Sequence, residues 1–134
     1  MSNTCNILRE AKTIAVVGFS DKPYRDSREI ALFLANKGYK VYGVNPTIDE
    51  LNVDGIPIVK SLREIKEKVD IVDIFRRSEF VPEIVDEAIK IGAKIIWMQL
   101  GVINYEAKKK AEGAGIEVIM NRCIKIEYLN CFYE

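Results

Sequence analysis

The chain has 134 residues, 49% of them hydrophobic and 30% charged, and its 20 Lys and Arg residues balance 20 Asp and Glu residues. This length and composition predict one globular domain over residues 1–134, large enough for a hydrophobic core. The zero net charge gives no attraction toward nucleic acid or a membrane surface, and no apolar run approaches the roughly 18 residues that predict a membrane span.

The sequence lacks the commonest catalytic arrangements, although catalysis by lysine or carboxylate side chains stays open. Three cysteines without a C-x-x-C pair argue against a disulfide framework or a zinc site, and we expect no metal site. The absence of histidine removes Ser-His and Cys-His nucleophile pairs and imidazole acid–base catalysis. The first residues have no signal-peptide pattern, so we expect a cytoplasmic protein, and we assign no catalytic residue.

Strands and helices alternate along the sequence. Residues 13–17 form an apolar run that predicts a buried strand, and residues 27–37 have the spacing of an amphipathic helix, which Asp26 or Ser27 is expected to cap. A second strand is expected over residues 40–44. The other expected elements are a short strand after residue 55, a short helix from about residue 61, strands over 69–75, 94–98 and 116–120, and helices over 81–91 and 103–114.

This alternation predicts an α/β fold, a Rossmann-like, doubly wound parallel sheet of five main strands with helices on both faces. Counted along the chain, the main strands are expected in the order 3-2-1-4-5. A ligand of such a sheet lies outside the carboxyl ends of the strands, where the strand order reverses. Polar or special residues follow the predicted strands and converge there: residues 18–27, 44–46, 75–77, 98–101 and 121–123.

The loop over residues 18–27 has the composition of a phosphate site, because it joins a buried strand to the start of a helix, where an anion is stabilised. Gly18 fills the first position of the G-x-G-x-x-G pattern of NAD sites. Ser20 and Pro23 stand where the other two glycines belong. At the end of the second strand, Asn45 stands where an NAD site needs an acidic residue, so the pattern argues against NAD.

Cations lie near the predicted mouth of the site. Arg25 is the one that we expect at the ligand, whereas Lys22 and Arg28 suit a solvated surface equally well. Arg76 and Arg77 are adjacent, so at most one of them is expected to face the pocket. These cations fit a ligand with a diphosphate and an additional phosphate monoester.

Five motifs follow these predicted strands in order. They are Val-Gly-Phe-Ser over residues 17–20 with Pro23, Arg25 and Ser27; Val-Asn-Pro over 44–46; Val-Asp-Ile-Val over 69–72 with Phe75 and Arg76; Gly-Ala-Lys over 92–94 with Trp97 and Gln-Leu-Gly over 99–101; and Asn-Arg-Cys over 121–123. With these motifs the chain, from about residue 11 to about residue 127, resembles the small stand-alone CoA-binding protein family. That family shares its Rossmann-like module with the CoA-binding domain of the succinyl-CoA synthetase alpha subunit.

The resemblance implies binding of coenzyme A or an acyl-CoA. It places the phosphates at residues 18–27, the adenosine beside residues 44–46, and the pantetheine arm near residues 75–76 and 97–101. The family is known as a binding domain without an assigned reaction. Relatives often have a histidine where this chain has Tyr128, so no role of that histidine carries over.

The candidate ligand-binding residues are Gly18, Phe19, Ser20, Lys22, Pro23, Arg25, Ser27, Val44, Asn45, Pro46, Phe75, Arg76, Gln99, Gly101, Arg122 and Cys123. Several of them also have a purely structural interpretation. Ser20 and Ser27 suit a turn and a helix cap without any ligand. Cys123 suits either an inert buried position or, beside Arg122, a thiol that forms a mixed disulfide with CoA under oxidising conditions.

These features favour a non-catalytic carrier, sensor or partner module for CoA. The alternative is a CoA-binding subunit of an acyl-CoA ligase or transferase whose catalytic residues lie on another chain. The aromatic segment over residues 128–133 is apolar for a chain end. It predicts either packing back on the domain or an interface with a second copy or another protein.

Overall fold

The computed structural model describes residues 3–132. Its elements in chain order are α1 (Asn3–Glu10), β1 (Thr13–Val17), α2 (Asp26–Asn36), β2 (Lys40–Val44), β3 (Asn52–Val53), β4 (Ile56–Val59), β5 (Ile71–Ile74), α3 (Val81–Lys90), β6 (Ile95–Met98), α4 (Tyr105–Gly113), β7 (Glu117–Met120) and α5 (Ile124–Phe132). Short 3-10 turns at Leu62–Glu64 and Ser78–Phe80 precede β5 and α3. The sequence did not predict α1, β3 or α5.

The strands form one sheet in the order β3-β4-β2-β1-β5-β6-β7. Neighbouring strands are parallel except β3 and β4, which pair antiparallel at one edge. The predicted α/β Rossmann-like fold is confirmed, but the five-strand count and the order 3-2-1-4-5 are wrong. The described residues form seven strands, and the five expected main strands stand in the order 2-1-3-4-5.

The short strand β4, and not β5, pairs with β2. Gly43 and Val44 of β2 stand opposite Ile58 and Val59 of β4. Ile56 and Ile58 of β4 are buried, and β4 occupies the edge of β2 that faces away from β1. β5 pairs with the edge of β1 that faces away from β2. Hydrophobic spacing predicts which segments form strands, but it does not predict which neighbour each strand takes.

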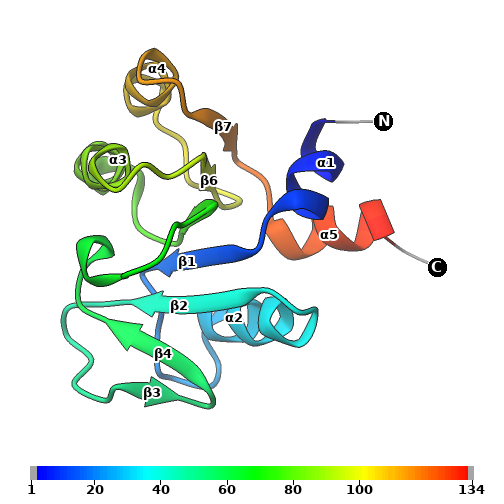
Figure 1. Ribbon diagram of the computed structural model, residues 1–134, viewed down its shortest axis with the longest axis vertical. Helices are drawn as coiled ribbons and strands as arrows, with labels where there is room; N and C mark the ends of the chain where they lie inside the picture. Colours follow the sequence, from blue (N-terminus) through cyan, green and yellow to red (C-terminus); the bar gives the residue numbers. More distant parts are fainter. Residues whose placement is uncertain (1–2, 133–134) are drawn as a thin grey trace.

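Helices cover both faces of the sheet (Figure 1). α3 and α4 pack on one face, where Val81, Val85 and Ala107 are buried. α2 packs on the other face together with α1 and α5, where Leu34 and Ile124 are buried. β1 lies between these layers and is buried along its whole length, which explains its unbroken apolar sequence. No helix within residues 3–132 is long and apolar enough to cross a bilayer.

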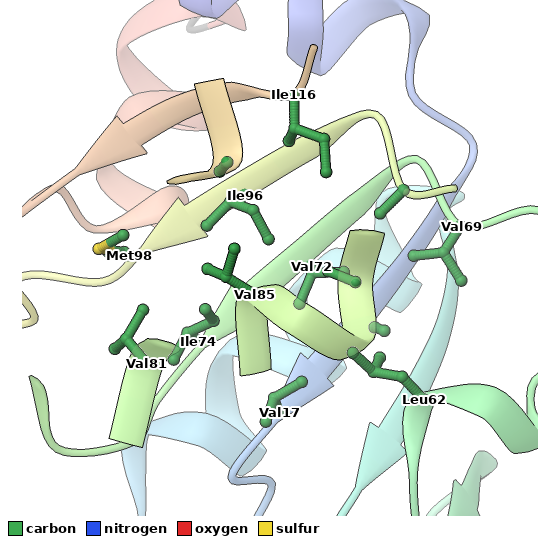
Figure 2. Close-up of a cluster of buried hydrophobic side chains, with 14 of the residues drawn as sticks. Val17, Leu62, Val69, Val72, Ile74, Val81, Val85, Ile96, Met98 and Ile116 are labelled. Atoms are coloured by element: carbon green, nitrogen blue, oxygen red, sulfur yellow. The ribbon is translucent and has the colours of Figure 1, made fainter. Parts of the chain in front are cut away.

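Figure 2 shows the core under α3. Val81 and Val85 of this helix point toward Val72 and Ile74 of β5. Ile71 belongs instead to the core under α2, because successive residues of a strand point to opposite faces of the sheet. The two cores are thus separated by a single layer of strands.

The two ends of the described chain are joined. Cys5 of α1 and Cys131 of α5 form a disulfide, so the expectation against disulfides is wrong for this pair. The two cysteines are 126 positions apart, and only the packing of α1 beside α5 brings them together. Tyr128 of α5 packs edge-on against Phe33 of α2, with ring centroids 5.6 Å apart. Tyr128 of the aromatic segment therefore packs back on α2, and Tyr133 lies outside the described residues.

β5 carries a buried carboxyl group. Asp73 is fully buried, and neither of its carboxyl oxygens has a hydrogen-bond partner among the described residues. In the sheet it stands between Val16 of β1 and Trp97 of β6, on the same face as Ile71. Burial raises the pKa of Asp73 well above the ordinary value of an aspartate. The folded protein therefore keeps this proton to a higher pH than the unfolded chain does.

We expect Asp73 to make the free energy of unfolding fall as the pH rises. Below the unfolded-state pKa of about 3.9, Asp73 is protonated in both the folded and the unfolded chain, so it does not change the free energy of unfolding with pH. Between that value and the raised folded-state pKa, only the unfolded chain releases the proton, which costs about 1.4 kcal/mol of stability per pH unit. Urea unfolding at mildly acidic, neutral and mildly alkaline pH should show Asp73→Asn gaining stability relative to the wild type as the pH rises. A difference that is constant with pH would contradict this.

Candidate functional site

The chain diverges at the carboxyl ends of β1 and β5. The segment after β1 leads to α2 on one face of the sheet, and the segment after β5 leads to α3 on the other. Ligands of open α/β sheets bind at such a switch point. Two adjoining pockets of about 460 and 510 Å³ open there and share Gly18 and Asn45. We call the first, lined mainly by residues 18–27, the loop pocket, and the second, which reaches α3, the helix pocket.

Gly18 ends β1 and brings three strands together. Its φ of +89° lies in the region that favours glycine, and its N–H donates to the carbonyl of Val44 at 3.0 Å. A Cβ at this position would lie 2.7 Å from the carbonyl oxygen of Phe75. The loop backbone therefore passes against the end of β5 with no room for a side chain.

We expect Gly18→Ala to destabilise the protein more than Gly115→Ala. Both glycines have a positive φ, +89° and +85°, so each variant carries about 1 kcal/mol for a left-handed L-residue. At Gly18 the new methyl group also meets backbone at 2.7 Å, whereas nothing lies within 4 Å at Gly115. Urea unfolding should show a loss of about 1 kcal/mol for Gly115→Ala and about 2 kcal/mol or more for Gly18→Ala. Equal losses would show that the close approach to Phe75 has no energetic consequence.

Two serine hydroxyls fold the loop on itself. Ser27 is buried, and its Oγ accepts a hydrogen bond from the N–H of Ser20 at 3.0 Å. The Oγ of Ser20 in turn accepts from the N–H of Lys22 at 3.1 Å. Both serines line the loop pocket. Because these bonds use the oxygens as acceptors, each O–H stays available as a donor.

α2 begins without a side-chain cap. Its N-cap is Arg25, which makes no capping hydrogen bond, so the prediction that Asp26 or Ser27 caps the helix is wrong. The Ser27 hydroxyl is turned back to Ser20, and the bond from the Glu29 N–H to the Arg25 carbonyl, at 3.2 Å, closes the first turn. The N–H groups before Glu29 have no partner within the helix. They stand at the loop pocket, where a helix start favours an anion.

The structure separates the cations predicted for the loop. Arg25 lines the loop pocket, whereas the exposed Lys22 and its neighbour Pro23 line neither pocket. Arg28 forms an ion pair with Asp54 of the β3–β4 connection. Of the three cations Lys22, Arg25 and Arg28, it is therefore Arg25 whose position fits contact with a ligand in the loop pocket.

Asn45 ties the loop after β1 to the loop after β2. Its Nδ2 donates to the carbonyl of Phe19 at 2.8 Å, and its Oδ1 accepts from the N–H and the hydroxyl of Thr47 at 2.8 and 2.7 Å. The Phe19 ring is fully buried against Gly43, where a Cβ would lie 2.8 Å from the ring. Asn45 thus holds the two loops together. Phe19 takes part in this contact through its backbone carbonyl, and its ring is buried in the core.

The helix pocket has an apolar wall and a charged rim. Residues 44–46 line it from the end of β2, and Ile84 lines it from α3. The guanidinium carbon of Arg76 lies 4.6 Å from the centre of the Phe80 ring, and both side chains line this pocket. The exposed Arg77 lines neither pocket. One of the two adjacent arginines therefore faces the cleft.

The sequence did not identify two parts of the helix pocket lining, Lys60 on one wall and a row of side chains along α3 on the opposite wall. Nζ of Lys60 donates to the carbonyls of Pro46 and Ile48 at 3.3 and 3.1 Å and so holds the loop after β2. A row of side chains at the helical spacing i, i+3, i+4 and i+7 lines the opposite wall: Phe80, Glu83, Ile84 and Glu87. That spacing is the signal that could have identified them.

Besides Lys22 and Pro23, four further predicted residues line neither pocket: Gln99, Gly101, Arg122 and Cys123. Oε1 of the buried Gln99 accepts from the N–H of Ile124 at 3.0 Å, at the start of α5. The carbonyl of Arg122 accepts from Nε1 of Trp97 at 2.9 Å, and Cys123 is a half-buried free thiol. These contacts hold α5 to the ends of β6 and β7, and contact of these residues with a ligand stays a prediction.

The chain matches known proteins over most of its length. Residues 12–129 match the family model described as a CoA binding domain. The chain is 43% identical to the uncharacterized protein YneT of Bacillus subtilis over 122 residues, which cover 91% of this chain and 89% of that protein. The solved structure of a hypothetical protein from Pyrococcus horikoshii OT3 superposes with a TM-score of 0.91 at 40% identity, covering 96% of this chain and 89% of that chain.

The chain also matches one part of a larger protein. It is 34% identical over 105 residues to subunit alpha of the ADP-forming acetate–CoA ligase I of Pyrococcus furiosus. The match covers 73% of this chain but 23% of the ligase subunit. The chain therefore spans less than a quarter of that subunit.

Proposed function

We propose that this chain, which belongs to the CoA binding domain family, binds coenzyme A or an acyl-CoA as a non-catalytic carrier, sensor or partner module. The nucleotide end of the ligand occupies the loop pocket and the helix pocket. The cytoplasmic location and the absence of nucleic-acid and membrane partners stay predictions from the sequence.

The observation that carries this proposal is the uncapped start of α2 at the loop pocket. Unpaired N–H groups and the helix dipole favour a diphosphate at this position. Arg25 lines the same pocket, and its guanidinium fork suits two phosphate oxygens. The O–H groups of Ser20 and Ser27 supply further donors.

The helix pocket suits the adenosine end of the ligand. Its volume of about 510 Å³ falls within the range of pockets that hold small molecules, about 300–1,000 Å³. Val44, Pro46 and Ile84 give it an apolar wall for a purine. Arg76, held over the Phe80 ring, places a cation at the rim for the additional phosphate monoester.

The pantetheine arm leaves this cleft along the carboxyl ends of the next strands. Phe75 lines the loop pocket at the end of β5. In the sheet, β6 lies beside β5 and β7 lies beside β6. Residues 99–101 follow β6, and residues 122–123 follow β7. This path brings Gln99, Gly101, Arg122 and Cys123 to the arm rather than to the nucleotide.

The similarity to a ligase subunit favours a second candidate function. In this alternative the chain is the CoA-binding subunit of an acyl-CoA ligase or transferase whose catalytic residues lie on another chain. Affinity purification from the native host distinguishes the two. Recovery with an ATP-grasp-type subunit, and acyl-CoA formation by the pair, supports the ligase subunit. A protein that purifies alone and binds CoA supports the carrier or sensor.

Calorimetric titration with CoA, dephospho-CoA and NAD at one salt concentration tests the proposal. We expect CoA to bind, and loss of the 3′-phosphate to weaken binding tenfold or more, about 1.4 kcal/mol. NAD should bind more weakly than CoA, because Asn45 stands where an NAD site holds the ribose with a carboxylate. Tighter binding of NAD, or no binding by any of the three, would contradict the proposal.

Arg25→Gln and Lys22→Gln form a matched pair of variants. Each removes one positive charge from the same loop, but Arg25 lines the pocket and Lys22 does not. We expect Arg25→Gln to weaken CoA binding about tenfold, as a lost charge-assisted hydrogen bond does. Lys22→Gln should change the dissociation constant less than about twofold, since an exposed charge outside the pocket is screened. Equal effects would show that the loop acts through its net charge and not through Arg25.

A further inference from the structure

The helices at the two ends of the described chain are sparsely anchored. Leu8 is the buried residue of α1, and Ile124 is the buried residue of α5. The two helices lie side by side on the α2 side of the sheet (Figure 1). The Cys5–Cys131 disulfide joins them and closes the chain between these residues into one covalent ring.

Both terminal helices contact the α2 segment. Tyr128 of α5 packs edge-on against Phe33 of α2 and against Tyr39, which follows α2, with ring centroids 5.6 and 6.1 Å apart. The hydroxyl of Tyr39 donates to the carbonyl of Leu8 in α1. Nζ of Lys125 in α5 lies 3.3 Å from a carboxylate oxygen of Glu29 in α2. The joined pair α1–α5 therefore supports the helix whose start faces the loop pocket.

α5 also reaches the carboxyl edge of the sheet. Its first N–H, from Ile124, donates to Oε1 of Gln99, and a guanidinium nitrogen of Arg122 lies 3.5 Å from the Glu127 carboxylate. The disulfide is at the other end of α5. This helix therefore runs from the disulfide to the edge of the sheet that carries the cleft.

We propose that the Cys5–Cys131 disulfide is a redox latch. In the disulfide form it holds α1 and α5 on α2. In the dithiol form these helices depend on few buried side chains and open more readily. The latch acts on the stability of the terminal helices, and its effect on ligand affinity, transmitted through α2, rests on the proposed function.

The chemistry requires a dithiol as reductant. One of its thiolates attacks a sulfur of the disulfide and forms a mixed disulfide, and the other protein cysteine leaves as a thiolate that takes a proton. The second thiol of the reductant then attacks the mixed disulfide, closes the oxidised reductant and releases the remaining protein thiol. Two electrons and two protons pass to Cys5 and Cys131. Both cysteines are half-buried rather than enclosed, so a small dithiol has access to the bond.

Hydrogen exchange tests the latch without any ligand. Wild-type protein is compared in its disulfide form and after reduction with dithiothreitol. We expect amide exchange in residues 3–10 and 124–132 to rise tenfold or more on reduction, while β1 and β5 keep their protection. The melting temperature should fall by about 10 °C, because the reduced chain regains the entropy of a long open loop when it unfolds.

Two variants serve as controls. Cys131→Ser should show the exchange of the reduced wild type under oxidising conditions, whereas Cys123→Ser keeps the disulfide and should match the oxidised wild type. Unchanged exchange in α1 and α5 on reduction, or a reaction of all three cysteines with a thiol reagent in the oxidised native protein, would overturn the latch. A parallel CoA titration of both redox forms should show weaker binding after reduction. Absence of CoA binding in both forms would instead remove the proposed function and leave the latch intact.

Discussion

The fold and the cleft both depend on how β1 is enclosed and how it ends. Ile14, Ala15 and Val16 have no exposed surface, because β2 and β5 flank β1 and helices cover both faces. A strand enclosed in this way can offer functional groups only where it stops. At that point the Gly18 backbone passes against Phe75, and this close passage brings the ends of β1, β2 and β5 to one cleft.

Some polar groups around the cleft form hydrogen bonds that hold its loops in place, and others face the loop pocket. Asn45 and the oxygen of Ser27 are engaged by backbone groups of the loops, and Lys60 holds the loop after β2. Arg25 and the first N–H groups of α2 face the loop pocket without a cap. A loop that is already held in place loses little entropy when a ligand binds, so these contacts lower the entropic cost of the binding proposed above.

The sequence was sufficient where local chemistry decides and insufficient where distant segments meet. The apolar run over residues 13–17 identifies β1, because burial on both faces leaves that signature. Strand order and the pairing of Cys5 with Cys131 depend on which segments pack together, which spacing along the chain does not record. The same limit holds in the cleft. Gln99 and Asn45 are both amides after an apolar strand, yet the Gln99 oxygen bonds α5 while Asn45 lines both pockets.

The two faces of the sheet differ in how their cores are closed. The core under α3 is packed by side chains such as Val72, Ile74 and Val85 (Figure 2). The core under α2 contains the unpaired carboxyl group of Asp73 and is closed by the sparsely anchored α1 and α5. A buried polar group without a partner and helices with few buried anchors both lower the free energy of local opening on that face. Since α2 forms part of this core and also begins at the loop pocket, the anion proposed at its start and the packing of α1 and α5 would stabilise the same helix. In the proposed latch, opening of the chain ends and occupancy of the cleft are therefore coupled through α2.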